Sequence, residues 1–364
     1  MYGSAGKERL LEGARRSPRN SSRSEFDFIN SLRRKALRRA GRIARSSFLP
    51  SSLILGIGDD AAVIEQRTGI DTVITADLLV EEVDFRLTTT RARWLGHKAL
   101  AVSLSDIAAM GARPRWALLG MGVPSFLWRS GFPELFYEGF FELADLHGVT
   151  LIGGDVSRTP ERVVIDSIVL GEVARHGAVF RSGARPGDHL FVTGELGGAR
   201  LGLGLLERRM YRDAGPVERQ AIEHAIRRQV LPEPRVSWGA LLGRERLATA
   251  MIDISDGLSS DIAHLCSESG VGASLHEERI PIDHSARYLG GRLRLDPLEA
   301  ALHGGEDFEL LFTVSPRSVS RLPGRVGNVP ATYIGDVTYE RDGIRIGARS
   351  RNRRLKSGGF RHFS

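Results

Sequence analysis

The chain has 364 residues, 41% of them hydrophobic, and a formal net charge of +7, and this length is sufficient for two ordinary domains with buried cores. No apolar run is long enough for a membrane helix and no apolar segment follows the charged start, which argues against a membrane protein and against secretion. Because Cys266 is its single cysteine, the chain cannot form a disulfide framework or a cysteine-rich zinc site, and we expect a cytoplasmic protein.

The positive charge is concentrated at the start of the chain. Residues 1–45 contain 13 Lys and Arg against 4 Asp and Glu. Their net charge of +9 leaves −2 for the rest, so we expect no nucleic-acid partner for the body of the protein. The basic, serine-rich residues 1–23 are typical of a disordered tail. RNA contact by this tail and an organellar transit peptide stay open as alternatives, although Glu8 and Glu12 count against the transit peptide.

The first half of the chain has the pattern of an α/β domain, which we place at residues 24–174. Residues 25–40 have apolar side chains at helical spacing and predict one amphipathic helix. After it, short β-forming runs alternate with glycine turns and with two longer helical segments. The predicted strands are 53–57, 71–76, 117–123, 149–152 and 163–173, and the predicted helices are 92–109 and 133–147.

A second series of elements begins after residues 174–180, where we place the domain boundary. A turn at residues 185–188 leads into a strand, and a glycine-rich loop then opens a helix near Ala199. The predicted strands are 189–193, 248–254 and 308–314, and the further predicted helices are 221–230 and 258–267. The chain is therefore predicted to be an α/β (α+β) protein, with a second domain at residues 175–364.

Acidic residues fall five times at the end of a predicted apolar strand, beside glycines. A single aspartate in such a place is typical of a turn or a helix cap. Five such segments in one chain suggest a shared role. The segments are Gly58-Asp59-Asp60, Thr75-Ala76-Asp77, Ser105-Asp106, Gly153-Gly154-Asp155 and Asp253-Ile254-Ser255-Asp256-Gly257.

Asp106 gives the most specific local signal. It continues the helical stripe of Leu95, Ala99 and Val102, which places a carboxylate on the face that packs inward. A buried carboxylate needs a cation or several hydrogen-bond donors, and no Lys or Arg lies within one turn of it. A metal ion held jointly with other carboxylates is therefore a credible partner.

Convergence of these carboxylates would require divalent cations. Asp253 and Ser255 share one face of their predicted strand, so they would point at a common ligand. Two carboxylates about 4 Å apart repel by roughly 4 kcal/mol at an effective dielectric constant of about 20. Oxygen ligands without His or Cys favour Mg²⁺ or Ca²⁺, and Mg²⁺ usually arrives with phosphates. The sequence therefore suggests a phosphate substrate.

The glycine loops allow more than one interpretation. Residues 194–198 precede a helix and could bind an anion at its N-terminus or could serve tight helix packing. Residues 56–61 imitate a dinucleotide-binding motif, but Asp59 and Asp60 would repel a pyrophosphate there. Neither a P-loop nor a protein-kinase motif set is present, so any ATP chemistry must use another fold.

Six motifs together resemble thiamine-monophosphate kinase, in the order and spacing of that family, and the resemblance covers roughly residues 24–364. The motifs are GIGDDAA at 56–62, KALAVSLSDIAAMGA at 98–112, LIGGD at 151–155, RSGA at 181–184, DISDGL at 253–258 and GGEDFEL at 304–310. The resemblance implies the two-domain fold of aminoimidazole ribonucleotide synthetase, with a homodimer whose N-terminal sheets join into a β-barrel and a C-terminal α/β domain. It also implies Mg²⁺-dependent transfer of phosphate from ATP to thiamine monophosphate.

The resemblance also implies roles for individual residues. The implied metal ligands are Asp60, Thr75, Asp77, Asp106, Asp155, Asp253 and Asp256, together with position 76, where Ala76 replaces the family's threonine. Gly154, Asp155, Arg181 and Ser255 would contact ATP, and Asp106, Asp155 and Asp253 would be catalytic. Glu306, Phe360 and position 84 would contact the substrate, with Asp84 in place of the family's histidine.

The two departures at Ala76 and Asp84 bear on activity and on substrate choice. Ala76 lacks a hydroxyl that could bind a metal, and the charge of Asp84 is unfavourable near a substrate phosphate. Alternatives are another ATP-using relative, such as aminoimidazole ribonucleotide synthetase, selenophosphate synthetase or the hydrogenase-maturation dehydratase. Cys266 occupies neither of the positions at which the last two carry a reactive cysteine. A non-catalytic, metal-dependent nucleotide-binding protein is the alternative from a different class.

Overall fold

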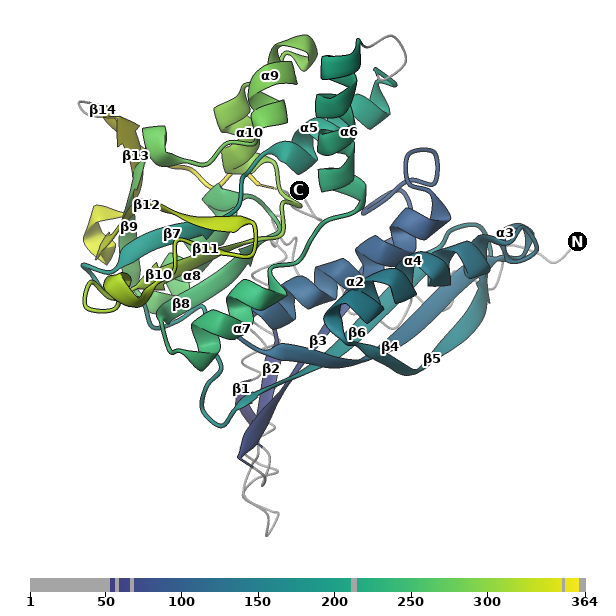
Figure 1. The fold of residues 1–364 in the computed structure, drawn as a ribbon, viewed down its shortest axis with the longest axis horizontal. Helices are drawn as coiled ribbons and strands as arrows, with labels where there is room; N and C mark the ends of the chain where they lie inside the picture. Colours follow the sequence, from purple (N-terminus) through teal and green to yellow (C-terminus); the bar gives the residue numbers. More distant parts are fainter. Residues whose placement is uncertain (1–52, 56–58, 66–68, 211–214, 349–350, 360–364) are drawn as a thin grey trace, which may run out of the picture.

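The structure is a computed structural model that describes residues 53–55, 59–65, 69–210, 215–348 and 351–359. The expected tail, the expected helix over 25–40 and Phe360 lie outside the described residues. The described chain forms two halves, each built on one β-sheet, with a group of helices beside the second (Figure 1). No helix in the described part has the length and apolar character needed to cross a membrane.

The first half contains a six-stranded sheet in the order β1-β2-β3-β6-β4-β5. Its pairs are antiparallel except for β4 and β5, which run parallel. Two long helices, α2 and α4, lie along one face of this sheet (Figure 1). The elements are β1 (Leu53–Leu55), β2 (Ala62–Glu65), β3 (Ile70–Val80), α2 (Ala92–Ala109), β4 (Arg113–Pro124), α3 (Ser125–Trp128), α4 (Phe132–His147), β5 (Thr150–Thr159) and β6 (Val164–Ala174).

The second half contains an eight-stranded sheet in the order β14-β13-β9-β12-β7-β10-β8, with β11 paired to β12. Its strands are β7 (His189–Thr193), β8 (Ala248–Ile254), β9 (Val271–His276), β10 (Glu309–Val314), β11 (Arg325–Val326), β12 (Val329–Tyr339), β13 (Ile344–Ala348) and β14 (Arg351–Arg354). Its helices are α5 (Gly198–Glu207), α6 (Pro216–Val230), α7 (Val236–Arg244), α8 (Leu258–Ser269), α9 (His284–Leu293) and α10 (Pro297–His303). Three short 3₁₀ helices are Glu277–Arg279, Val319–Arg321 and Glu340–Asp342.

Helix α2 lies between the two sheets and is buried on nearly all sides. The core on its side of the molecule includes apolar residues from the six-stranded sheet, from α4 and α7, and from β8 and β10. Glycines permit this close packing, because a Cβ at Gly96 or at Gly239 would overlap a backbone carbonyl of the neighbouring helix. The sequence stripe placed Asp106 on an inward face, and the residue is half-buried there. Helix α2 has no broad polar face of the kind that amphipathic helices present to water.

The other face of the six-stranded sheet, which we call the open face, is not covered by any described element. Alternate side chains of β3 point to it, and Leu78 there is 59% exposed. Half-buried apolar residues of β6 lie on the same face, among them Val164 and Ile168. The described strands of this sheet do not close into a barrel, and the barrel expected across a homodimer stays a prediction.

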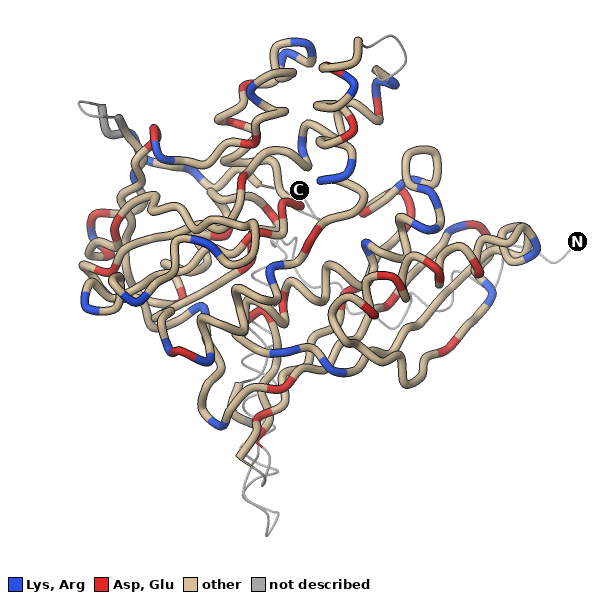
Figure 2. The backbone as a smooth tube through the Cα atoms, in the orientation of Figure 1, with Lys and Arg blue, Asp and Glu red and all other residues tan. Residues whose placement is uncertain are grey.

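Lysines, arginines, aspartates and glutamates are interspersed over both halves of the described chain (Figure 2). This mixed pattern differs from the single basic face or stripe that is typical of nucleic-acid-binding domains. It agrees with the near-neutral charge that the sequence leaves for residues beyond the basic start.

Candidate functional site

Three aspartates from separate parts of the sequence meet where the two halves join. Asp60 precedes β2, Asp106 lies near the end of α2, and Asp253 lies near the end of β8. Each offers one carboxylate oxygen, and these atoms all lie within 4.8 Å of one another. We call this group the carboxylate cluster. It can form because α2 passes between the sheets and carries Asp106 to the ends of strands from both.

Hydroxyl groups hold the carboxylates of this region in place. Three donate a hydrogen bond to one aspartate oxygen each: Thr75 Oγ1 to Asp106 Oδ2 at 2.5 Å, Ser103 Oγ to Asp77 Oδ2 at 2.7 Å and Ser105 Oγ to Asp253 Oδ2 at 2.7 Å. Both serines are fully buried on α2. Such partners fix a carboxylate without neutralising it, as the residues behind metal ligands commonly do.

Arg181 connects the two halves at the cluster. Its Nε and Nη2 atoms donate to the two oxygens of Asp60 at 3.0 and 2.6 Å, a bidentate pair. Its backbone N–H donates to Asp59 Oδ2 at 3.1 Å. Burial alone would lower the pKa of Arg181, but the negative charge of Asp60 outweighs it, so the pKa is raised and the guanidinium stays charged.

The electrostatics of the region favour a bound cation. Burial raises the pKa of Asp59 to about 7 and that of Asp77 to about 6, and neighbouring carboxylates add to both shifts. Burial and the surrounding aspartates also raise the pKa values of Asp106 and Asp253 well above the usual range. A divalent cation with oxygen ligands would relieve this repulsion, so the donor set fits Mg²⁺.

A second polar group surrounds Glu306. Lys98 Nζ lies 2.6 Å from Glu306 Oε1 although the Lys98 side chain is only 3% exposed, and Gln229 Nε2 donates to Glu306 Oε2 at 2.6 Å. Glu306 has a φ of 56°, unusual for a residue with a side chain, and its N–H donates to the carbonyl of Ser255 at 2.7 Å. Such strain commonly marks functional sites.

The Glu306 group and the carboxylate cluster are joined by α2. Lys98 and Asp106 are eight residues apart, which is about 12 Å along a helix and about 2.2 turns, so they differ by about 80° around its axis. The two side chains therefore lie within one broad face of α2. This arrangement can hold a ring or cation at one end and phosphates at the other.

Two expected ligands do not join the cluster within one chain. Successive side chains of a strand alternate between faces, so Ala76 points to the open face while Thr75 and Asp77 point to α2. Asp155 is exposed on β5 and aligned through β4 and β6 with Leu78, which places it on the open face as well. The alternation of side chains along a strand thus places on opposite faces residues that are neighbours in the sequence.

The expected strand end before Asp155 is corrected by the structure, since β5 runs on to Thr159 and the two glycines lie inside it. Gly154 approaches the backbone of β4 so closely that a Cβ would overlap the carbonyl oxygen of Leu119. Its φ of 153° also disfavours a side chain. The glycines therefore serve close strand packing and do not mark a turn.

The remaining expected residues occupy loops. Asp84 Oδ2 accepts the N–H of Val80 at 2.8 Å, so this carboxylate closes the turn after β3. Ser255 and Asp256 are half-buried in the loop between β8 and α8. The negative charge of Asp256 contributes to a raised pKa of Asp261, after burial, which is the larger cause.

Sequence reasoning missed several polar residues of this region. Asp59, Lys98, Ser103, Ser105 and Gln229 had no assigned role, although each contacts an expected site residue. Lys98 could have been found, because it continues the stripe of Val102 and Asp106 toward the start of α2. Serines on a helix carry no comparable signal, since they are common in buried helices without function.

The glycine loop at residues 194–198 serves packing and capping. Asp307 accepts the N–H of Gly197 at 2.7 Å and that of Ala199 at 3.3 Å, so a carboxylate of the chain already occupies the start of α5. A Cβ at Gly197 would approach the backbone of Ala301 to 2.9 Å. Of the two interpretations that the sequence left open, the structure favours packing.

A separate cavity of about 870 Å³ lies between the segment before α2 and helices α5 and α6, and it does not include the carboxylate cluster. Trp94 lines it, one turn before Lys98 on the same helix. An ion pair between Arg86 Nη1 and Glu207 Oε1, at 2.7 Å, connects its two sides. The other arginines that line it are Arg91, Arg209, Arg219 and Arg227.

Two family models match the chain. The model of the AIR synthase related protein, N-terminal domain, matches residues 58–173, and that of the C-terminal domain matches residues 185–347. The fold, with its carboxylate cluster at the junction of the two matched domains, is that of an AIR synthase related protein.

Similarity to individual proteins narrows this class. Thiamine-monophosphate kinase of Bacillus subtilis is 38% identical over 315 residues, 86% of this chain and 91% of that protein. The enzyme of the same name from Escherichia coli K12 is 36% identical and covers 80% of this chain and 86% of its own length. The solved structure of AaThiL complexed with AMPPCP and TMP matches with a TM-score of 0.77 and 30% identity, over 93% of this chain and 97% of that one. The chain belongs to the thiamine-monophosphate kinase family.

Proposed function

We propose that the protein transfers the terminal phosphoryl group of ATP to the phosphate of thiamine monophosphate, which yields thiamine diphosphate and ADP, with Mg²⁺ held at the carboxylate cluster. Relatives named thiamine-monophosphate kinase support this activity. The observation that carries the proposal is the convergence of Asp60, Asp106 and Asp253 from both halves of the fold. Clustered carboxylates, which would repel phosphate by themselves, become a phosphate site once divalent cations bind.

The residues that would hold Mg²⁺ are the members of the cluster and the oxygen donors beside them: Asp60, Thr75, Asp77, Asp106, Asp253 and Asp256. Bound Mg²⁺ supplies positive charge that offsets the repulsion between two phosphate groups. The chain's own part is to keep the carboxylates ionised and oriented, which the hydroxyls of Ser103 and Ser105 support. These roles agree with the resemblance and are part of the proposal.

Arg181 would bind nucleotide phosphate. Its guanidinium is held by Asp60 but is 22% exposed, so it retains N–H groups for a phosphate oxygen. Gly154 and Ser255 are proposed as further ATP contacts. The attacking atom would be an oxygen of the substrate phosphate, which is mostly ionised at neutral pH because its second pKa is about 6. No general base is then required.

The Glu306 group would bind the other end of the substrate. The Glu306 carboxylate can face the cationic ring of thiamine monophosphate, and Lys98 and Gln229 hold it in place. Its partner Lys98 lies about 12 Å along α2 from Asp106, so the proposed ring site is separate from the proposed phosphate site. Asp84 is proposed as a neighbouring contact with a mainly local role, since one of its oxygens closes a turn. Phe360 remains a proposal from the resemblance.

We place the contact of a homodimer on the open face of the six-stranded sheet, within the expected domain 24–174. An apolar sheet face normally packs against another layer, and Leu78 and its neighbours have none among the described elements. Asp155 lies on this face, so its proposed role in binding metal and ATP would be exercised at the junction of two chains. The cytoplasm, where ATP and Mg²⁺ are available, is the proposed location.

A substrate comparison tests this function. ADP release is measured with thiamine monophosphate, thiamine and other phosphorylated pyrimidines, with and without Mg²⁺. Of these compounds, we expect only thiamine monophosphate to support ADP release. The release should depend on Mg²⁺, and its amount should equal that of the thiamine diphosphate formed. ADP release that follows thiamine, or that occurs equally with every phosphate, would contradict the proposed substrate.

A further inference from the structure

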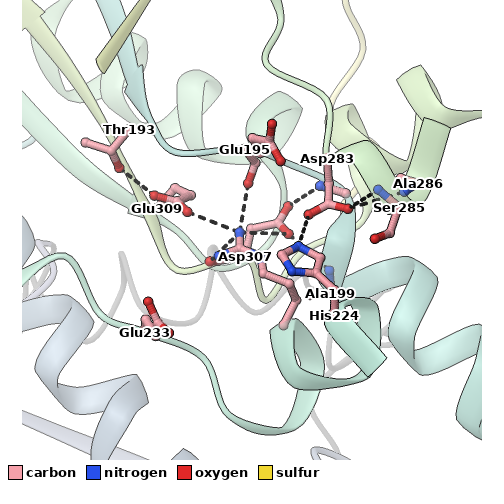
Figure 3. Close-up of polar contacts among 12 residues, drawn as sticks. Thr193, Glu195, Ala199, His224, Glu233, Asp283, Ser285, Ala286, Asp307 and Glu309 are labelled. Atoms are coloured by element: carbon pink, nitrogen blue, oxygen red, sulfur yellow. Dashed lines mark hydrogen bonds and ion pairs between the residues drawn. The ribbon is translucent and has the colours of Figure 1, made fainter. Parts of the chain in front are cut away.

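A second group of possible metal ligands lies away from the carboxylate cluster, where α6 meets the start of α9. His224, Asp283 and His284 each offer one ligand atom, and these atoms lie within 4.8 Å of one another. The two imidazole ring centres are 4.3 Å apart. His224 Nε2 is 3.0 Å from Asp283 Oδ2, and the two side chains face each other (Figure 3).

Glu195, from the loop after β7, adds a fourth donor. Its Oε2 lies 3.4 Å from Nδ1 of His284. In a tetrahedral site with metal–ligand bonds of about 2.0–2.2 Å, neighbouring ligand atoms are about 3.3–3.6 Å apart. The two measured separations, 3.0 and 3.4 Å, are near this range. Glu195 is outside the group of three whose ligand atoms already lie within 4.8 Å of one another, so its flexible side chain would have to rotate to become the fourth ligand of one ion.

Asp283 is oriented for this role by the helix that it caps. Its Oδ1 accepts the N–H groups of Ser285 at 2.8 Å and Ala286 at 3.3 Å, which leaves Oδ2 directed at His224 (Figure 3). The carboxylate is therefore held in a fixed orientation, as ligands of metal ions commonly are.

The arginines near the site are paired with other carboxylates, so they do not neutralise the negative charge of the site. Arg228 Nη2 lies 3.1 Å from Glu309 Oε1 and 3.8 Å from Asp307 Oδ1, and Arg235 binds both oxygens of Glu309. These buried arginines are therefore matched by two buried carboxylates of their own. The carboxylates of the site are additional to that network.

We propose that Glu195, His224, Asp283 and His284 form a binding site for Zn²⁺ or a similar first-row transition metal. Two imidazole nitrogens and two carboxylate oxygens suit such an ion, whereas the oxygen-only cluster suits Mg²⁺. The side chains of His224 and His284 are 39% and 62% exposed, so an ion can reach them from solvent. The site is thus distinct in place and in chemistry from the carboxylate cluster.

Metal at this site would restrain helix α6. The ion would join α6 to the start of α9, two helices that share a small apolar core with α5, and also to the loop after β7. The same helix carries Gln229, which donates to Glu306. Metal binding would therefore stabilise the helix that positions Glu306, the carboxylate proposed to bind the substrate.

Cobalt titration tests the proposal on the full chain, prepared without a polyhistidine tag and stripped by a chelator. Saturating Mg²⁺ is present, so that the carboxylate cluster does not bind Co²⁺. We expect one equivalent of Co²⁺ with the visible absorption of a four-coordinate site, displaced by Zn²⁺, and a rise in Tm. His224→Ala and His284→Ala should each weaken Co²⁺ binding by about 100-fold or more, because even outer partners of ligands change affinity by about 10- to 100-fold.

A matched control is His176→Asn, which removes an exposed imidazole from the first half and tolerates its φ of 56°. Its Co²⁺ affinity should equal that of the unmodified chain. If His224→Ala does not fold, His284→Ala carries the test, because its side chain is largely exposed. Unchanged Co²⁺ affinity in the folded variants, or Co²⁺ absorption that appears only when Mg²⁺ is omitted, would overturn the proposal. A lower Tm with intact Co²⁺ binding would assign His224 a purely structural role.

Discussion

Replacement of Asp106 by asparagine separates charge from shape at the carboxylate cluster. In the unmodified chain, Thr75 Oγ1 lies 2.5 Å from Asp106 Oδ2. The asparagine amide keeps an oxygen that can accept this hydrogen bond, but the substitution removes one negative charge. We expect Asp106→Asn to lose turnover with ATP and thiamine monophosphate, and to lose the thermal stabilisation that Mg²⁺ gives. The physical reason is that a neutral amide binds Mg²⁺ far less well than a carboxylate does.

The free energy involved follows from the distances. Two unit charges 4.8 Å apart, the limit within which the three ligand atoms lie, repel by about 3.5 kcal/mol at an effective dielectric constant of about 20. Asp106 makes two such contacts, with Asp60 and Asp253. Because burial already raises the pKa of Asp106 and of Asp253, protons relieve much of this repulsion. The metal-free variant should therefore be more stable by only about 1–3 kcal/mol at neutral pH, a rise of a few degrees in Tm.

Two assays decide the outcome. ADP release is followed as Mg²⁺ is varied, and Tm is measured with and without Mg²⁺. Asp71→Asn is the control, since this buried β3 carboxylate accepts the N–H of His176 at 2.7 Å and lies outside the cluster. Its turnover should persist. Near wild-type turnover of Asp106→Asn at limiting Mg²⁺ would refute the assignment, and lower stability of its metal-free form would indicate damage to the fold.

Three further outcomes are expected. In the metal-free protein, the raised pKa values of Asp59, about 7, and Asp77, about 6, favour the protonated folded state, so stability is greatest below pH about 4 and falls as pH rises through about 6 to 7. Thermal melting in a chelator should show this decline, and Mg²⁺ should reduce it. Lys98→Met should raise KM for thiamine monophosphate by about 10-fold or more, because it leaves the Glu306 carboxylate without its cation. KM for ATP should change little, and equal effects on both KM values would argue against the assignment. Gly154→Ala should lower the free energy of unfolding by more than about 2 kcal/mol, since its Cβ would overlap a carbonyl of β4, and denaturant titration would show it.

Long, strongly patterned elements were predictable from the sequence. Helix 92–109 and strands 189–193 and 248–254 have the predicted bounds, because their apolar runs are flanked by clear turn residues. Strand β5 was predicted too short, since its glycines look like a turn in sequence but pack against a neighbouring backbone in space. Helix α9 and strands β9, β12 and β13 were not predicted; β13, for example, is a short strand that carries arginine, and its pairing depends on distant segments.

All three residues of the carboxylate cluster were predicted from the sequence, but two other residues were grouped with them that do not join the cluster within one chain. Asp60, Asp106 and Asp253 were identified from their residue type and their place beside apolar segments, and they converge. Ala76 and Asp155 were grouped with them, yet strand alternation and sheet order place both on the open face. Which face a residue occupies depends on the register and order of strands, and these are set by contacts far apart in the sequence.

The central position of α2 makes the two sheets interdependent. This helix contributes to the packing of both sheets, and its apolar residues belong to a core that continues from the first half into the second. If either half opened, the helix would lose one wall and expose a largely apolar surface to water. The protein should therefore unfold as one cooperative unit, and neither half should remain soluble when it is produced alone. Evolution can alter one half only within the limits that the shared helix sets for the other.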